Sequence, residues 1–323
     1  MSLGDNSYLS NLCFADDVVL MAANPNQLRV MMADLTQAAA ARGLKIHTGK
    51  TKVLTNAHDV GTMSVPTNIT VDDKQFTVLS FEQATKYLGR KVCFKDPHET
   101  EFNNRIAAAW GAFSKHKQEL TDRRHRLENR LKLFEAVVTS TMLYGSEAWA
   151  LRVDQQRRLQ VVQRKMLRMI LNARRRMVPA SSSNDSISGD VESDATEADT
   201  LEPWPAFLRR TAQWTQEQLG KAGLKQWIVQ WRRKKWEWAA KLAIPGNDKW
   251  SAVATLWQPL IHSSCPRGRK QARPRKRWES DFADYLGTAY PDEVRPWHKV
   301  AQDMEWWLSK ADEFSIDEQQ IHE

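Results

Sequence analysis

The N-terminal segment of the chain alternates short apolar runs with polar breaks. Residues 7–22 hold two apolar runs on either side of the adjacent carboxylates Asp16 and Asp17. Strand-length apolar runs that meet at a polar pair are typical of a β-hairpin. The pattern therefore predicts a hairpin with Asp16 and Asp17 at its turn.

A helix and several short strands are predicted next. Asn24 and Pro25 can begin the helix, apolar residues recur at helical spacing from Gln27 to Arg42, and Gly43 is a stop signal. Mixed strands around a single helix indicate an α+β fold for this part of the chain. The strand candidates are Leu44–Ile46, Lys52–Leu54, Ile69–Val71, Phe76–Leu79 and Tyr87–Val92.

After Pro97 the apolar spacing becomes helical. It predicts three helices, at about Glu99–Leu120, Leu127–Leu143 and Asp154–Arg176. The third helix has an apolar face and an opposite face that is strongly basic. That basic face comprises Arg157, Arg158, Arg164, Lys165, Arg168, Arg174, Arg175 and Arg176.

The composition changes twice in the second half of the chain. Residues 180–203 are rich in Ser, Thr, Asp and Glu and contain no Lys or Arg, which is typical of a disordered acidic linker. Residues 204–262 carry helical patterns rich in tryptophan, and two more helices are predicted at about 278–287 and 296–313. We expect Trp227, Trp231 and Trp238 to be core residues of a small helical bundle. Stacking on unpaired bases is the alternative for the tryptophans, above all for Trp278 after the basic run.

Charge and cysteine content narrow the class of protein. The chain has 47 Lys and Arg against 39 Asp and Glu, a net charge of +8 that permits a polyanionic partner. Its three cysteines form no CxxC or Cys/His cluster, so we expect no zinc site and no disulfide framework. With no signal peptide and no long apolar run, we expect a soluble intracellular protein, nuclear or cytoplasmic, without a membrane partner.

The acidic pair at the predicted turn suits a divalent cation. Two adjacent carboxylates repel each other unless a counter-charge lies between them, and Mg²⁺ prefers carboxylate oxygens. Two such ions can hold the attacking and leaving oxygens of a phosphoryl transfer. A solvated turn is the alternative, since Asp-Asp also occurs at Asp72-Asp73.

The order of the motifs resembles that of reverse transcriptases of non-LTR (LINE-like) retrotransposons. Phe14-Ala15-Asp16-Asp17 is followed by Gly43-Leu44-Lys45-Ile46, Lys50-Thr51-Lys52 and Tyr87-Leu88-Gly89. The resemblance implies that Asp16 and Asp17 are catalytic residues that hold Mg²⁺, and that Lys50 acts as general acid at the triphosphate. It also implies that Tyr87 and Gly89 belong to the turn that supports the primer.

The resemblance continues beyond this segment. Leu143-Tyr144-Gly145, Arg158-Leu159-Gln160 and Arg164-Lys165-Met166 resemble the thumb-like helices of the family, and Arg267-Gly268-Arg269 resembles a motif near its C-terminus. The implied regions are a partial palm at 1–95, an all-α thumb-like segment at 96–176, the linker at 177–203 and a Trp-rich, basic helical domain at 204–323. The parent activity that the resemblance implies is RNA-directed DNA polymerisation, a nucleotidyl transfer.

The resemblance also implies a missing component. The palm of the family needs a third metal-binding aspartate on an upstream strand, and only fifteen residues precede Asp16 here. We therefore expect weak or absent Mg²⁺ binding and no catalysis by this chain alone. A nucleic-acid-binding module without enzymatic activity, or a polymerase completed in trans by an upstream fragment, are the alternatives.

Two basic surfaces are candidates for binding RNA or DNA. One is the third helix, through Arg157, Arg164, Lys165 and Arg168, for which a solvated helix face is the alternative. The other is the run at 267–277, for which a nuclear import signal and a plain loop are alternatives. Its positive residues are Arg267, Arg269, Lys270, Arg273, Arg275, Lys276 and Arg277.

Overall fold

A computed structural model describes residues 9–57, 67–178, 200–256 and 277–316 of the 323-residue chain. Its contacts group these residues into two units, each assembled from separate stretches of sequence. One unit comprises residues 1–105, 147–150 and 235–311, and the other 106–146, 151–234 and 312–323. This grouping differs from the four predicted regions, whose boundaries stay a prediction.

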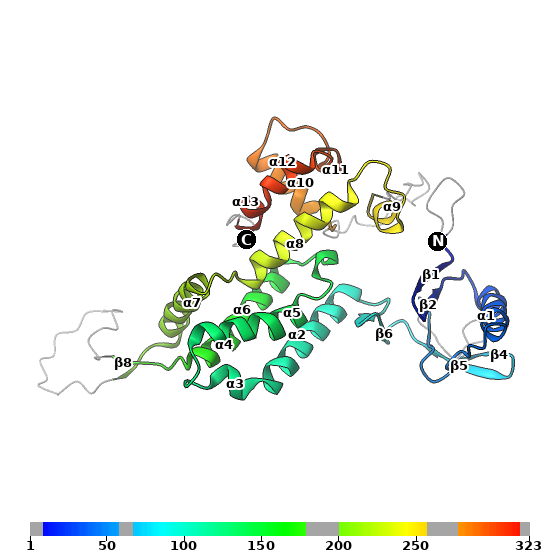
Figure 1. Cartoon of the computed structure of the whole chain (residues 1–323), viewed down its shortest axis with the longest axis horizontal. Coiled ribbons are helices and arrows are strands. Elements are labelled where there is room, and N and C mark those ends of the chain that lie inside the picture. The colour runs from blue at the N-terminus through cyan, green and yellow to red at the C-terminus, as the bar shows by residue number, and fades with distance from the viewer. Residues whose placement is uncertain (1–8, 58–66, 179–199, 257–276, 317–323) are drawn as a thin grey trace, which may run out of the picture. The chain divides into compact units, whose positions relative to one another are not determined.

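The predicted N-terminal hairpin and helix are present. β1 (Asn11–Phe14) pairs antiparallel with β2 (Asp17–Leu20), and α1 (Pro25–Ala40) follows (Figure 1). The Asn24 side chain caps α1 by accepting a hydrogen bond from the Gln27 backbone N–H at 2.9 Å. Gly43 ends it with φ +72°, and the Leu44 N–H bonds back to the Ala39 carbonyl at 2.9 Å.

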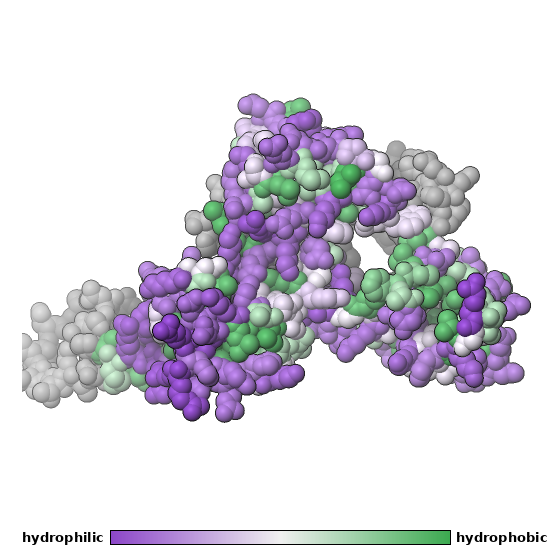
Figure 2. Space-filling view, viewed as in Figure 1, coloured by the Kyte–Doolittle hydropathy of each residue, from purple (hydrophilic) through white to green (hydrophobic). Residues whose placement is uncertain are grey.

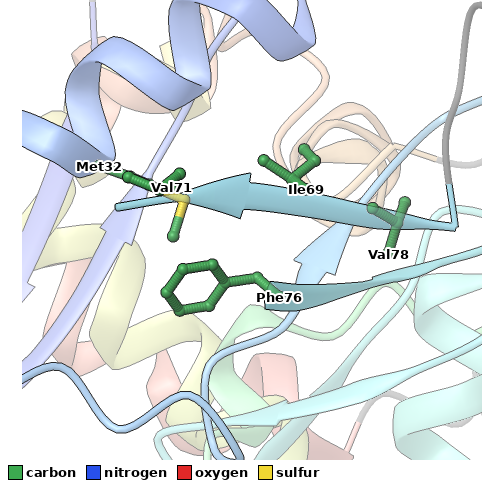
Figure 3. Packing of buried hydrophobic residues seen from close by; sticks show 5 residues of the cluster. All are labelled: Met32, Ile69, Val71, Phe76 and Val78. Atoms are coloured by element: carbon green, nitrogen blue, oxygen red, sulfur yellow. The ribbon is translucent and has the colours of Figure 1, made fainter. Parts of the chain in front are cut away.

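A second small sheet lies against α1. β3 (Val53–Leu54) pairs parallel with β5 (Lys74–Leu79), which pairs antiparallel with β4 (Asn68–Val71). One face of this sheet and α1 enclose a core that also receives Leu20 of β2. Figure 3 shows its buried residues, which are Met32, Ile69, Val71, Phe76 and Val78.

Two strand predictions are wrong in detail. Leu44–Ile46 is not a strand, because the Leu44 N–H is used to cap α1. Tyr87–Val92 is not one strand but part of a second hairpin, β6 (Thr85–Tyr87) and β7 (Arg90–Val92). Leu88 and Gly89 have φ values of +47° and +74°, so the chain reverses there.

The predicted helices are present but divided. The first is α2 (Pro97–Lys115) and α3 (Lys117–Thr121), which separate at His116. The second is α4 (Leu127–Phe134), the π-helical η1 (Glu135–Thr139) and α5 (Ser140–Met142), followed by the 3₁₀ turn η2 (Ser146–Ala148). A π-turn adds a residue to the helical turn, which shifts the buried face along the helix.

The third predicted helix is too long by five residues. α6 spans Val153–Leu171 and ends at Asn172, whose φ of +51° is left-handed. Arg174, Arg175 and Arg176 therefore lie beyond the helix, and the prediction that they belong to its basic face is wrong. β8 (Met177–Val178) and β9 (Thr200–Leu201) then pair antiparallel.

Helices form the remainder of the described chain. They are α7 (Trp204–Lys221), α8 (Trp227–Leu242), α9 (Trp250–Leu256), α10 (Ser280–Ala289), α11 (Trp297–Val300), α12 (Met304–Ser309) and α13 (Ala311–Ile316). The helix predicted at 296–313 is thus three short helices. Together with the N-terminal strands, these helices make the described chain a mixed α and β structure, as predicted.

Six of the thirteen tryptophans in the described ranges are buried. Trp227 and Trp231 are fully buried, and the Trp227 ring stacks on Phe134 at 5.7 Å between centroids. Trp238, predicted to be buried, is only half-buried, and Trp236 takes the core position and stacks on Trp307 at 3.7 Å. Within the described ranges, no helix is both long and apolar enough to cross a membrane.

Candidate functional site

The acidic pair lies at the tip of the β1–β2 hairpin. Phe14 pairs with Asp17, so the loop consists of Ala15 and Asp16, and Asp17 opens β2. Both carboxylates are exposed. The hairpin placement predicted from the sequence is confirmed, although only Asp16 is within the loop.

The hairpin itself is incompletely packed. Its strands expose Leu12 by 38%, Phe14 by 64% and Val18 by 39%. Figure 2 shows hydrophobic side chains gathered over β1 and β2 on a face that is otherwise mainly hydrophilic. The backbone edges of β1 and β2 pair only with each other in the described part of the chain.

A second acidic pair occupies a comparable place. Asp72 and Asp73 form the two-residue loop between β4 and β5, with φ values of +47° and +60°. Asp tolerates left-handed backbone because its short side chain can bond locally, so Asp-Asp is a natural hairpin loop. Position at a hairpin tip therefore does not by itself distinguish Asp16 and Asp17 as a metal site, and their assignment as metal ligands stays a prediction.

The two carboxylates alone do not make a full Mg²⁺ site. Over the described ranges, no three His, Cys, Asp or Glu side chains come together in a group that could hold a metal ion. Mg²⁺ requires near-octahedral oxygen coordination, and a two-metal centre needs carboxylates that bridge both ions. The described residues do not fit that centre.

Lys50 lies in a separate exposed turn. Its backbone N–H donates to the His47 carbonyl at 3.2 Å, and the His47 ring Nδ1 also lies 3.2 Å from that nitrogen. No hydrogen bond or ion pair between described residues joins Lys50 to Asp16 or Asp17. The predicted partnership of these three residues therefore stays a prediction.

The hairpin turn at Tyr87–Gly89 is held by a buried ion pair that the sequence did not reveal. Glu101 and Arg105, one turn apart on α2, are 1% and 6% exposed and approach to 2.6 Å. Arg105 also donates to the Gly89 carbonyl, and the Lys91 N–H donates to Glu101 at 2.6 Å. The i, i+4 spacing was the available signal, but burial of the pair depends on the β6–β7 hairpin.

The basic face of α6 is accessible along its length. Arg157, Arg164, Lys165 and Arg168 recur on one side of the helix; Arg157 and Lys165 are exposed, and Arg164 and Arg168 are half-buried. Burial lowers the pKa of Arg164 and of Arg168, and Arg164 lowers the Arg168 pKa further through repulsion. The Lys165 ammonium lies 5.5 Å from the centre of the half-buried Trp110 ring.

The basic run at 267–277 lies outside the described residues except for Arg277. The undescribed positions are Arg267, Arg269, Lys270, Arg273, Arg275 and Lys276. Arg277 pairs with Glu279 at 2.8 Å. Trp278 next to it is a packing residue, because its Nε1–H donates to the Glu147 carbonyl at 2.7 Å and its ring contacts Phe282.

Comparisons with known proteins identify one distant relative. The chain is 26% identical over 304 residues to a Caenorhabditis elegans protein described as uncharacterised and transposon-derived. The alignment covers 93% of this chain and 94% of the relative. No family model matches the chain, and no solved structure matches it.

The relative agrees with the sequence analysis at a coarse level. Its description points to a transposable element, which is the origin that the ordered motifs around Asp16, Lys50 and Gly89 imply. The description names no polymerase and no nucleic-acid ligand. The finer assignment therefore depends on the residues of this chain.

Proposed function

We propose that this chain derives from the reverse transcriptase of a non-LTR retrotransposon and binds nucleic acid without polymerising DNA on its own. One observation carries the proposal: the Phe14-Ala15-Asp16-Asp17 motif forms the tip of a two-stranded hairpin that leads into a capped amphipathic helix. A palm active site needs adjacent carboxylates held this way, because a rigid strand pair fixes them beside the phosphates.

The surroundings of the hairpin support the second half of the proposal. Asp16 and Asp17 have no third carboxylate beside them among the described residues, and Mg²⁺ would remain mostly hydrated on two exposed groups. In the parent enzyme Mg²⁺ supplies charge neutralisation at the transferring phosphate. Since the described residues place only this pair of carboxylates at the hairpin, we assign the chain binding through the basic helix surface.

Nucleic-acid binding is argued from the α6 face. Arg157, Arg164, Lys165 and Arg168 place four positive charges along about three turns of one helix. Each charge that neutralises a phosphate releases counterions, so affinity for RNA or DNA should fall steeply with salt. Arg164 and Arg168 are half-buried on this face, and Arg157 and Lys165 are exposed.

Primer extension tests the absence of catalysis. The purified chain is mixed with a primed RNA template, deoxynucleotides and Mg²⁺, beside Asp16→Ala. The expected result is no extension by either protein. Incorporation that requires Mg²⁺ and disappears in Asp16→Ala would overturn the proposal.

A polymerase completed in trans is the second candidate. The exposed Leu12, Phe14 and Val18 and the open edges of the hairpin favour it, since an unpaired strand edge is a template for another strand. Mixing the chain with a separately produced fingers-and-palm fragment should then restore extension. Failure of the mixture under conditions where a fused protein extends the primer would eliminate this candidate.

A further inference from the structure

A cluster around Glu202 joins the end of α6 to the start of α7. Glu202 is 6% exposed, and its carboxylate accepts hydrogen bonds from Arg210 Nε at 2.8 Å and Nη2 at 2.7 Å. The Arg175 guanidinium donates to the Glu202 backbone carbonyl at 2.7 Å, and Arg210 donates to the Arg174 carbonyl at 3.0 Å. These bonds fix the three consecutive arginines that follow α6.

The cluster carries an excess of positive charge. Among the described residues, the ion pair of Glu202 is with Arg210, at 2.7 Å. Across the described ranges, Arg174, Arg175 and Arg176 form no ion pair with a carboxylate side chain. Arg174 and Arg176 are exposed, so their guanidinium groups can contact a ligand from solvent.

Trp204, two residues after Glu202, provides an open aromatic surface. It is 56% exposed, whereas Trp227, Trp231, Trp236 and Trp307 are fully buried. Phe207, which is only 6% exposed, supports the Trp204 ring at 5.2 Å between centroids. The Arg210 guanidinium lies 5.7 Å from the Phe207 ring, so the same arginine contacts both the Glu202 carboxylate and the ring that supports Trp204.

Two apolar side chains extend the surface along the β8–β9 ladder. Met177 and Leu201 are directly opposite each other and are 57% and 52% exposed. Opposite residues in a ladder point to the same face of the sheet. We call Arg174, Arg175, Arg176, Met177, Leu201 and Trp204 the Arg–Trp patch.

We infer that the Arg–Trp patch binds single-stranded nucleic acid, with an unpaired base stacked on Trp204 and phosphates on Arg174 and Arg176. Base stacking on an aromatic ring beside a positive groove is the general chemistry of sequence-tolerant single-strand binding. A duplex hides the faces of its bases, so it can use the arginines but not the tryptophan ring. The inference rests on the proposed nucleic-acid binding and assigns it a second, strand-selective site.

The test compares two ligands and five proteins. Fluorescence anisotropy of a labelled 12-nucleotide oligothymidine and of a blunt DNA duplex is measured with the full chain, Trp204→Ala, Trp204→Phe and the double variant Arg174→Ser/Arg176→Ser. The charge-matched control is Lys115→Ser/Lys117→Ser, which removes two exposed lysines at the α2–α3 junction. Because the substituted side chains are exposed, all variants are expected to fold.

Trp204→Ala should weaken oligothymidine binding by roughly 5- to 100-fold and Trp204→Phe by less, while duplex affinity changes less than about twofold. Arg174→Ser/Arg176→Ser should lower the number of counterions released on oligothymidine binding by about one to two. This number is the slope of log affinity against log salt concentration, and the lysine control should leave it unchanged. Equal oligothymidine affinity in Trp204→Ala and the unmodified chain overturns the inference. So does duplex binding without oligothymidine binding, whereas binding of neither ligand overturns the proposed function itself.

Discussion

The guanidinium Nε of Arg105 lies 2.6 Å from the carboxylate of Glu101, and the two residues clamp the Tyr87–Gly89 turn against α2. Glu101 also accepts the Lys91 N–H at 2.6 Å and the Asn104 Nδ2–H at 3.1 Å. A buried pair of this kind gains little over an apolar pair, but losing one partner leaves the other charge buried alone. The clamp therefore makes the position of the turn depend on a single carboxylate.

Glu101→Gln should destabilise the chain by roughly 3–5 kcal/mol, because Arg105 would lose its counter-charge while still buried. Urea denaturation measures the change. Glu99→Gln on the same helix is the matched control, since Glu99 is only half-buried. Equal stability of the two variants would mean that the clamp contributes nothing.

Lys235 and Asp281 form a second buried pair, with side chains 0% and 4% exposed, among the rings of Trp278 and Phe282. Lys235→Met should cost roughly 3–5 kcal/mol, because the buried Asp281 carboxylate would lose the ammonium that it pairs with. Adding Asp281→Leu should recover most of that loss, since an apolar pair satisfies the same space. A double variant no more stable than Lys235→Met would contradict this account.

Glu202 predicts a sensitivity to acid. Its hydrogen bonds from Arg210 lower its pKa from the ordinary 4.5 to about 2. A carboxyl with a depressed folded-state pKa stabilises the fold above pH 4.5, and this contribution is lost as pH falls from about 4.5 to about 2. In that pH window, the denaturation midpoint of Glu202→Gln should change less with pH than the midpoint of the unmodified chain. Chemical denaturation at a series of pH values measures this difference.

Glu293 provides the comparison for the acid experiment. Hydrogen bonds from Arg295 lower its pKa to about 2 as well. Glu293→Gln should therefore flatten part of the same window while leaving the Glu202 contribution in place. If both variants lose stability with falling pH as the unmodified chain does, these two ion pairs do not govern acid stability.

Ala15 has a φ of +51° in the loop that carries Asp16. An L-residue other than Asn or Asp pays roughly 1–2 kcal/mol for left-handed backbone, and Gly does not. Ala15→Gly should therefore slow amide hydrogen exchange of the β1 and β2 pairs. Ala107→Gly, in the middle of α2, is the control and should destabilise that helix by about 0.5–1 kcal/mol. Faster amide exchange of the hairpin in Ala15→Gly would exclude backbone strain at the loop.

Local patterns predicted the elements that depend on local interactions. The hairpin at Asp16, the cap at Asn24 and the stop at Gly43 are decided by residues within a few positions of each other. The end of α6 was missed because arginines favour helix, and the left-handed Asn172 overrode that preference.

Long-range packing could not be predicted from the same patterns. Helical spacing predicted that Trp238 is buried in the core. Instead Trp236 of α8 is the buried residue, and it stacks on Trp307, which is distant in sequence. Likewise, no local signal joins Lys235 to Asp281 or Glu202 to Arg174–Arg176. The candidate residues Asp16, Asp17 and Lys50 came from the order of the motifs along the chain.

The most direct test of the account is the affinity of the full chain for an RNA–DNA hybrid as the salt concentration is varied. The account predicts tight binding at low salt that weakens linearly on a log–log plot. The slope of that plot counts the counterions released on binding, and Arg164→Ser/Lys165→Ser/Arg168→Ser should reduce this number by roughly two to three. A chain with no measurable affinity for the hybrid at low salt, or a slope unaltered by the triple substitution, would contradict it.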